Sequence, residues 1–245
     1  TSVRADTQTW NTTTGDWSEV ANWTTAVPVD GDDVIITNRG AFVLLTNSTP
    51  WLSSMVISNA SLICSNWNTT IYVTNLTILN SGILTCAGPF TNMAMSNRVS
   101  LNCTNLFVGS NGAVDVNGKG YAGGLTLVSG GYAKGNGPGG GPNGTIVGAS
   151  YGGAGIANAR LVQTNTYGSV TAPLDPGSGG TGGSGAGSIG GSGGGAVCIT
   201  AIQAVVNGNI SANGSNNLLI GGHNSGGAGG GIYITCDTIT GTNGA

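Results

Sequence analysis

The residues able to do acid–base or metal chemistry are few in this 245-residue chain, and the densest group is Asp30-Gly31-Asp32-Asp33. Carboxylate and carbonyl oxygens on a flexible loop are the ligands that Ca²⁺ prefers, so Asp30, Asp32 and Asp33 form a candidate calcium site. The full calcium-loop spacing requires a distal Glu, which is missing here. A plain turn that leads into the apolar run Val34-Ile35-Ile36 is the competing interpretation.

The other candidates for catalysis stand alone in the sequence. Asp115 lies in an alternating strand-like segment, Asp175 stands between two prolines as a turn residue would, and Asp237 has no acidic neighbour. The sole histidine, His223, lies in a Gly-rich loop without an adjacent acid, as is typical of a solvated polar residue. These positions assemble no Ser/His/Asp or Cys/His set. We therefore predict no catalytic residue and no cofactor apart from the candidate calcium ion.

The cysteines are odd in number, so at least one has no partner within the chain; they are Cys64, Cys86, Cys103, Cys198 and Cys236. Cys64 and Cys86 each follow a leucine by two residues at the end of a strand-like segment. Neighbouring strands lie about 4.8 Å apart, within the Cα range of a disulfide, so a Cys64–Cys86 bridge is one prediction. A buried ladder of free thiols is the alternative that we favour.

Sequons of the form Asn-x-Ser/Thr accept N-linked glycan when a protein is secreted. A chain so rich in Asn, Ser and Thr would hold about half of the observed number or more by chance, so the motif alone says little. The candidate glycosylation sites are Asn11, Asn22, Asn47, Asn59, Asn68, Asn75, Asn102, Asn143, Asn209 and Asn213.

Composition excludes several classes of partner. Charged residues make up 6% of the chain and the net charge is −3, so no basic patch exists for nucleic acid or for an anionic membrane surface. The longest apolar run, 196–206, is too short and too polar to span a bilayer. Glycine is abundant, with 47 residues, while Asn, Ser and Thr supply the polarity. We expect neither a nucleic-acid partner nor membrane insertion.

A repeat indicates how the chain is organised. Residues 74–84 return in closely similar form as 104–114, an offset of 30, and in each copy apolar residues alternate before a Gly interrupts them. A period of 20 to 50 residues is typical of a solenoid, whose units bury their apolar rows only against one another. We therefore expect Leu76 beside Leu106, Ile78 beside Val108, and Asn75 facing outward. Further strands are expected at 34–37, 41–45, 55–57, 62–64 and 71–73.

The segment that precedes the repeats holds Trp10, Trp17 and Trp23. The terminal coil of a solenoid exposes an apolar face that an atypical unit must cover, so residues 1–33 are predicted to be a Trp-rich N-terminal cap. A carbohydrate-binding platform made of the same three tryptophans is the functional alternative.

Glycine dominates residues 118–195, and Gly177–Gly195 is the densest part. A flexible linker is the default interpretation of such sequence. However, strand-like islands interrupt the glycines, and Gly195 and Gly208 have counterparts at Gly231 and Gly244, an offset of 36. We therefore predict a Gly-rich insertion within a β-helix that spans 34–245. Packed polyglycine strands that present a receptor-binding tip are a further interpretation of this insertion.

Three features together resemble a group of large secreted bacterial surface proteins. They are the tryptophan frame that ends in Gly31-Asp32-Asp33-Val34-Ile35-Ile36, the irregular repeats, and the runs Gly-Gly-Gly-Ala-Val-Cys-Ile-Thr (193–200) and Gly-Gly-Gly-Ile-Tyr-Ile-Thr (229–235). The resemblance is to right-handed parallel β-helices of the pectate-lyase-like kind, including autotransporter-like passengers and adhesins. It implies an all-β fold of that type, exported to the cell surface or beyond.

Such folds serve several functions, so the sequence leaves two open. The first is a non-enzymatic structural or adhesive role, with a carbohydrate or cell-surface ligand and with self-association through coil ends into a fibre. The second is a polysaccharide-active enzyme, motivated by Trp17, Trp23 and the aspartates near them, because stacked coils can bring separated residues together.

Overall fold

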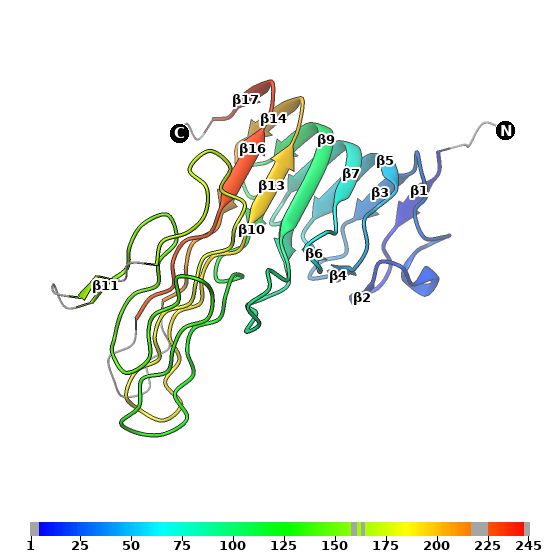
Figure 1. Cartoon of the computed structure of the whole chain (residues 1–245). Helices are drawn as coiled ribbons and strands as arrows, with labels where there is room; N and C mark the ends of the chain where they lie inside the picture. Colours follow the sequence, from blue (N-terminus) through cyan, green and yellow to red (C-terminus); the bar gives the residue numbers. More distant parts are fainter. Residues whose placement is uncertain (1–4, 158–160, 163–164, 217–224, 243–245) are drawn as a thin grey trace.

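A computed structural model of the chain describes residues 5–157, 161–162, 165–216 and 225–242 (Figure 1). Within these residues the only helical segment is one 3₁₀ turn, η1 (Val20–Asn22), and all other regular structure is strand. The predicted all-β class with parallel sheets is confirmed.

The larger sheet has nine strands, and every pair in it is parallel. Seven strands follow one path and two more extend the sheet beside β9. The path is β1 (Thr7–Thr9), β3 (Asp33–Ile36), β5 (Trp51–Ser58), β7 (Ile71–Leu79), β9 (Val99–Val108), β13 (Val197–Thr200) and β16 (Ile232–Thr235), and the additional strands are β14 (Gln203–Val206) and β17 (Thr238–Thr240).

The second sheet has six strands, again all parallel. Its order is β2 (Thr14–Asp16), β4 (Phe42–Leu45), β6 (Ser61–Cys64), β8 (Ile83–Cys86), β10 (Ala113–Asp115) and β15 (Asn209–Ser211). The chain alternates between the two sheets from β1 to β10, so each return of the chain adds one strand to each sheet. We call the two sheets together the strand stack. Figure 1 shows β1 at one end of it and β16 and β17 at the other. A separate antiparallel pair joins β11 (Ile156–Ala157) to β12 (Leu161–Val162).

The register of β7 and β9 follows the repeat. Leu76 pairs with Leu106 and Ile78 pairs with Val108, as predicted, and all four side chains are buried. Asn75 is exposed, and its Oδ1 accepts a hydrogen bond of 2.8 Å from Nδ2 of Asn105 on the next strand. The offset of 30 therefore identifies both the adjacent coils and the side of the sheet that each residue faces.

The long strands bend in the middle. In β5, Leu52 and Met55 are buried while Ser53 and Ser54 between them both face outward, which breaks the alternation of a straight strand. The strand predicted at 55–57 therefore covers only the part of β5 that follows the bend. From β5 to β10, the two arms of each long strand and the following strand of the second sheet give three strand segments for each return of the chain, and their inward residues join a single apolar core.

The glycines of the repeat lie where successive turns touch. A Cβ on Gly82 would lie 2.2 Å from the carbonyl oxygen of Ile57, and one on Gly112 would lie 2.3 Å from that of Ile78. Neither distance is compatible with a side chain. The repeated spacing of Gly82 and Gly112 thus reflects close approach of backbones from coil to coil.

The second repeat has an offset of 35 in the structure, so the predicted offset of 36 is wrong by one residue. Val197 pairs with Ile232 and Ile199 pairs with Ile234. Side chains alternate between the two faces of a strand, so an offset of 36 would have set inward residues against outward ones. The apolar alternation, rather than the shared Gly-Gly-Gly run, determines the register.

The N-terminal tryptophans form a compact cluster over the first coils. The rings of Trp10 and Trp17 each meet Trp23 edge to face, with centroids 5.1 and 4.8 Å apart. Nε1 of Trp23 donates a hydrogen bond to the carbonyl of Trp17 at 2.7 Å. All three side chains are buried in the core, so they serve as apolar cover and none is available as a carbohydrate platform.

The Gly-rich sequence packs into a bundle of extended segments beside the stack, projecting away from the sheets in Figure 1. We call residues 118–157, 165–195, 212–216 and 225–231 the Gly-rich bundle. Residues 176–183 form its centre and are buried at eight successive positions. A sheet strand with one face in solvent would alternate between buried and exposed, so this segment is enclosed on all sides.

Backbone hydrogen bonds explain the enclosure. The central segment bonds to four neighbours, whereas a strand within a sheet has two. Its amide and carbonyl groups bond to Tyr121 and Gly124, to Asn136 and Gly141, to Gly191 and Gly194, and to Ser225 and Ala228, at N–O distances of 2.8 to 3.1 Å. A flexible linker is therefore the wrong interpretation of residues 177–195.

Close contact, more than backbone conformation, requires glycine in this bundle. Of the glycines in 177–195 only Gly187 has a positive φ, at 83°. In contrast, a Cβ on Gly193 would lie 1.8 Å from the carbonyl oxygen of Gly177, and one on Gly179 would lie 2.0 Å from that of Ala122. Segments can approach this closely only where side chains are absent.

Candidate ligand-binding face

The carboxylates of the candidate calcium site are each held by protein donors. Asp32 is buried, and its carboxylate accepts hydrogen bonds from the backbone amides of Asp6 and Val29, both at 3.0 Å. Asp30 accepts from the amide of Trp51 at 2.8 Å, and Asp33 accepts from the hydroxyl of Ser54 at 2.5 Å. The turn interpretation accounts for all three: they tie successive coils together.

The isolated candidates stay apart. The carboxylate of Asp115 caps its own turn through the amide of Asn117 at 2.9 Å, and Asp237 is exposed just before β17. Asp175 lies at the edge of the Gly-rich bundle, where its carbonyl accepts from the amide of Gly231 at 3.0 Å. His223 lies outside the described residues. Across the part of the chain that the structure describes, no three His, Cys, Asp or Glu side chains gather as metal ligands would.

Cys64 and Cys86 are register partners on β6 and β8, and both are buried free thiols. The predicted bridge is absent for a geometric reason. Paired residues of a parallel sheet hold their Cα–Cβ bonds nearly parallel about 4.8 Å apart, whereas a disulfide draws the Cβ atoms to about 3.8 Å. Burial raises the pKa of both thiols, to about 12 for Cys86 although Lys119 opposes the shift, so they are unreactive core residues.

Most of the sequon asparagines lie at the surface. Eight are exposed, whereas Asn22 and Asn102 are half-buried. The side chain of Asn22 is engaged on both sides, since Nδ2 donates to the carbonyl of Asp16 at 2.9 Å and Oδ1 accepts from Thr12 at 3.2 Å. We therefore expect Asn22 to be a poor glycan acceptor among the ten.

The exposed aromatic face of the molecule lies on β5 and β7 and was not among the predicted sites. Trp51 is 45% exposed and pairs in register with Tyr72, with ring centroids 5.8 Å apart and planes inclined by 32°. Nε1 of Trp51 donates to Oγ1 of Thr74 at 3.1 Å, and its amide donates to Asp30. The ring is thereby held in place on a sheet rather than on a mobile loop.

Polar side chains border this aromatic pair in rows across the strands. Asn102 of β9 is the register partner of Tyr72. Past the bend, Asp33, Ser54, Asn75 and Asn105 succeed one another across β3, β5, β7 and β9. We call Trp51, Tyr72, Asn75, Asn102 and Asn105 the aromatic face. It offers a flat apolar surface beside amide donors and acceptors.

The sequence contains a signal for this face. Trp51 stands outside the N-terminal cap, and the 21-residue spacing from Trp51 to Tyr72 is the distance from Met55 to Leu76, which also pair. To predict that Trp51 lies beside Tyr72, one must know that β5 and β7 are offset by 21 residues. The repeat in the sequence gives only the offset of 30 between β7 and β9.

Comparison with known families gives one match. Residues 22–129 match the family model for the G8 domain, a β-rich domain of extracellular type. The matched segment runs from the last tryptophan of the cap through β10 into the Gly-rich bundle, and so includes the aromatic face. It does not show a pectate-lyase-like or autotransporter family.

No curated protein and no solved structure matches the chain. Among the described residues there is no helix long and apolar enough to cross a membrane.

Proposed function

We propose that this protein is a non-enzymatic extracellular binding protein, an adhesin in the broad sense, whose aromatic face holds a glycan. The exposed and rigidly held Trp51–Tyr72 pair carries the proposal. Sugar rings have apolar C–H faces and a rim of hydroxyls, so a flat aromatic surface bordered by amides complements them. Trp and Tyr also supply large contact areas at a low cost in conformational entropy.

The scaffold of this proposal is a right-handed parallel β-helix. From β5 to β10 three strand segments for each return of the chain surround one core, and strands of like position pair in parallel from coil to coil. Crossover connections between parallel strands of one sheet are right-handed in about 98% of cases, which supports the hand. A stack of this kind holds outward side chains at fixed spacing, as an extended ligand requires.

An extracellular or cell-surface location is supported by the G8 match to residues 22–129. Self-association of coil ends into a fibre is a separate prediction that analytical ultracentrifugation can test.

A polysaccharide-active enzyme receives less support from the geometry. The residues that motivated this hypothesis have structural roles. Trp17 and Trp23 are buried, and Asp30 and Asp32 accept hydrogen bonds from backbone amides. No specific observation favours turnover over binding.

The test is a titration of neutral and acidic oligosaccharides with the intact protein, made without N-glycans because Asn75 and Asn102 are themselves sequons. We expect at least one oligosaccharide to bind and Trp51→Ala to weaken it about tenfold or more. Phe42→Ala is the matched control, because Phe42 is 54% exposed on the other sheet. Equal binding by Trp51→Ala and the unaltered protein, or no binding across the panel, would contradict the proposal.

A further inference from the structure

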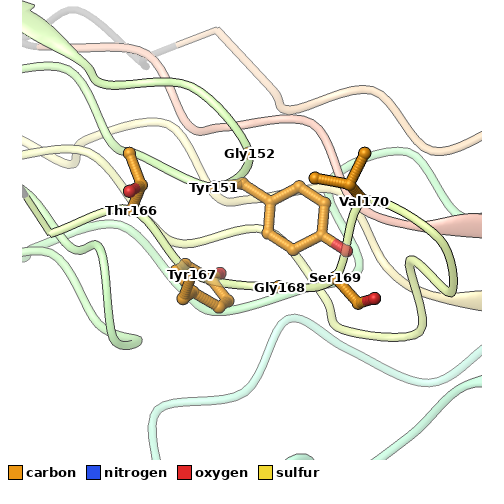
Figure 2. Close-up of a pocket in the computed structure, with 7 residues that line it drawn as sticks. All are labelled: Tyr151, Gly152, Thr166, Tyr167, Gly168, Ser169 and Val170. Carbon is orange, nitrogen blue, oxygen red and sulfur yellow. The ribbon is translucent and has the colours of Figure 1, made fainter.

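A second aromatic site lies in the Gly-rich bundle, on a different part of the molecule from the aromatic face. Tyr151, Gly152 and the segment 166–170 line an open pocket of about 240 Å³ (Figure 2). The rings of Tyr151 and Tyr167 are 5.0 Å apart at their centroids and inclined by 71°, so they form two walls that meet at an angle. Val170 stands at the rim with its side chain wholly exposed.

Both rings are fixed by their surroundings. The ring of Tyr151 lies against Gly168, whose φ of +87° and lack of a side chain allow the contact: a Cβ there would lie 2.6 Å from Cε2 of Tyr151. The hydroxyl of Tyr167 donates to the carbonyl of Pro176 at 2.5 Å and accepts from the hydroxyl of the buried Ser178 at 2.8 Å. The pocket is therefore preformed.

Among the described residues, Asp175 is the charged group that acts on both pocket tyrosines. No Lys, Arg, Asp or Glu lines the pocket, and the residue that precedes Pro176 is Asp175. Burial raises the pKa of both tyrosines, and the negative charge of Asp175 raises each further. The phenols are therefore neutral at physiological pH. Their π faces are electron-rich, and the nearby carboxylate adds to the negative potential.

We propose that this pocket binds an alkylammonium group, held against the rings of Tyr151 and Tyr167. Aromatic walls attract a cation within about 6 Å of the ring centroid, and an alkylated ammonium is weakly hydrated and brings apolar surface. Its methyl or methylene groups would cover Val170, and Asp175 would supply long-range attraction. A sugar acid or a phosphate would instead be repelled.

Choline and its neutral carbon isostere 3,3-dimethyl-1-butanol are the probes, since they share a shape and differ in charge. Titration of the intact protein is followed through the tyrosine ring signals in NMR spectra. We expect choline to bind about fivefold more tightly than the isostere or better. Equal affinity for the two probes would mean that the pocket recognises apolar shape and not charge. If choline shifted neither the Tyr151 nor the Tyr167 signals, the pocket would not bind it, and either result overturns the proposal.

Two variants of equal net charge test whether the attraction for choline comes from Asp175 or from the overall charge of the protein. Asp175→Asn should weaken choline binding several-fold and leave the isostere unchanged, whereas Asp237→Asn, at an exposed carboxylate before β17, should leave choline binding unchanged. Equal effects of the two substitutions would mean that only overall charge matters, and would contradict the assignment. Trp51→Ala should not alter choline binding, so failure of this site and failure of the aromatic face are distinguishable.

Nα-acetyl-trimethyllysine amide, as a third probe that carries the same single charge as choline, separates the two sources of such a group. We expect it and choline both to bind more tightly than the neutral isostere. The tighter of the two identifies a peptide side chain or a free small molecule as the source.

Discussion

The strand stack and the Gly-rich bundle bury backbone in opposite ways. In the stack, strands pair side by side within a sheet and turn one face of side chains into an apolar core. In the bundle, the central segment 176–183 is surrounded on all sides by other backbones, and hydrogen bonds to four segments take the place of side-chain packing. Side chains in an apolar core can repack around a substituted residue of similar volume. Backbones in direct contact cannot make room for an added group in this way. The two regions should therefore differ in the substitutions that they tolerate.

The largest effect is expected in the stack, from removing core volume. Leu76 is 1% exposed, so Leu76→Ala should lower the free energy of unfolding by about 3 kcal/mol through lost burial and an unfilled cavity. Leu76→Met keeps the volume and should cost less than about 1.5 kcal/mol. Denaturant unfolding measures both. If the Met variant were as unstable as the Ala variant, the stack would lack the adaptability that distinguishes it from the bundle.

A smaller loss is expected in the bundle, from adding a single methyl group. A Cβ on Gly230 would lie 1.9 Å from the carbonyl oxygen of Gly195, so Gly230→Ala should cost about 2 to 3 kcal/mol by forcing backbones apart. The adjacent Gly229→Ala is the control, since its Cβ would have 3.7 Å to the nearest atom and Ala restricts the unfolded chain. We expect it to be neutral or slightly stabilising. Equal effects of the two substitutions would show that the bundle is loosely packed.

The smallest predicted effect concerns pH, and it arises from thiols in the core of the stack. The pKa of Cys86 rises from 9.0 to about 12 on burial, so above pH 9 the unfolded state loses this proton while the folded state keeps it. Stability should therefore fall as pH rises between about 9 and about 12, with a loss of about 1.4 kcal/mol by pH 10 from this group.

The Cys86→Ala variant should show a shallower decline than the unaltered protein when unfolding is compared at pH 8 and pH 10. Only the pH dependence is compared, because the substitution also leaves a small cavity. Parallel curves would mean that Cys86 already ionises in the folded state, which contradicts its burial in a sealed core.

The stack was largely predictable because its signal is carried by side chains. Alternation placed Leu76 and Ile78 inward, and the offset of 30 identified their partners. The predicted offset of the second repeat was wrong by one residue because it was taken from the Gly-Gly-Gly run. Glycine does not indicate which face of a strand is buried, whereas Val197 and Ile199 do. The turn role of Asp30, Asp32 and Asp33 was one of two interpretations that local sequence left open, and the donors lie on other coils.

The bundle and the sites were less predictable for the same physical reason. Glycine has no side chain whose type could indicate burial or exposure. A packed polyglycine segment and a flexible linker therefore look alike in the sequence. The Tyr151 pocket depends on contacts of this kind, through Gly168 and the Pro176 carbonyl. The aromatic face required the spacing from Trp51 to Tyr72, which follows from coil length and not from any motif.

Hydrogen–deuterium exchange of the peptide that covers 176–195 tests most directly whether backbone packing alone makes a core. Its buried amides donate to carbonyls of neighbouring segments, as those of Gly177, Gly179 and Gly180 do. We predict protection comparable to that of β7, with exchange slowed by orders of magnitude relative to an unstructured chain. Exchange of this peptide within seconds, while β7 remains protected, would contradict the account and return residues 177–195 to the status of a linker.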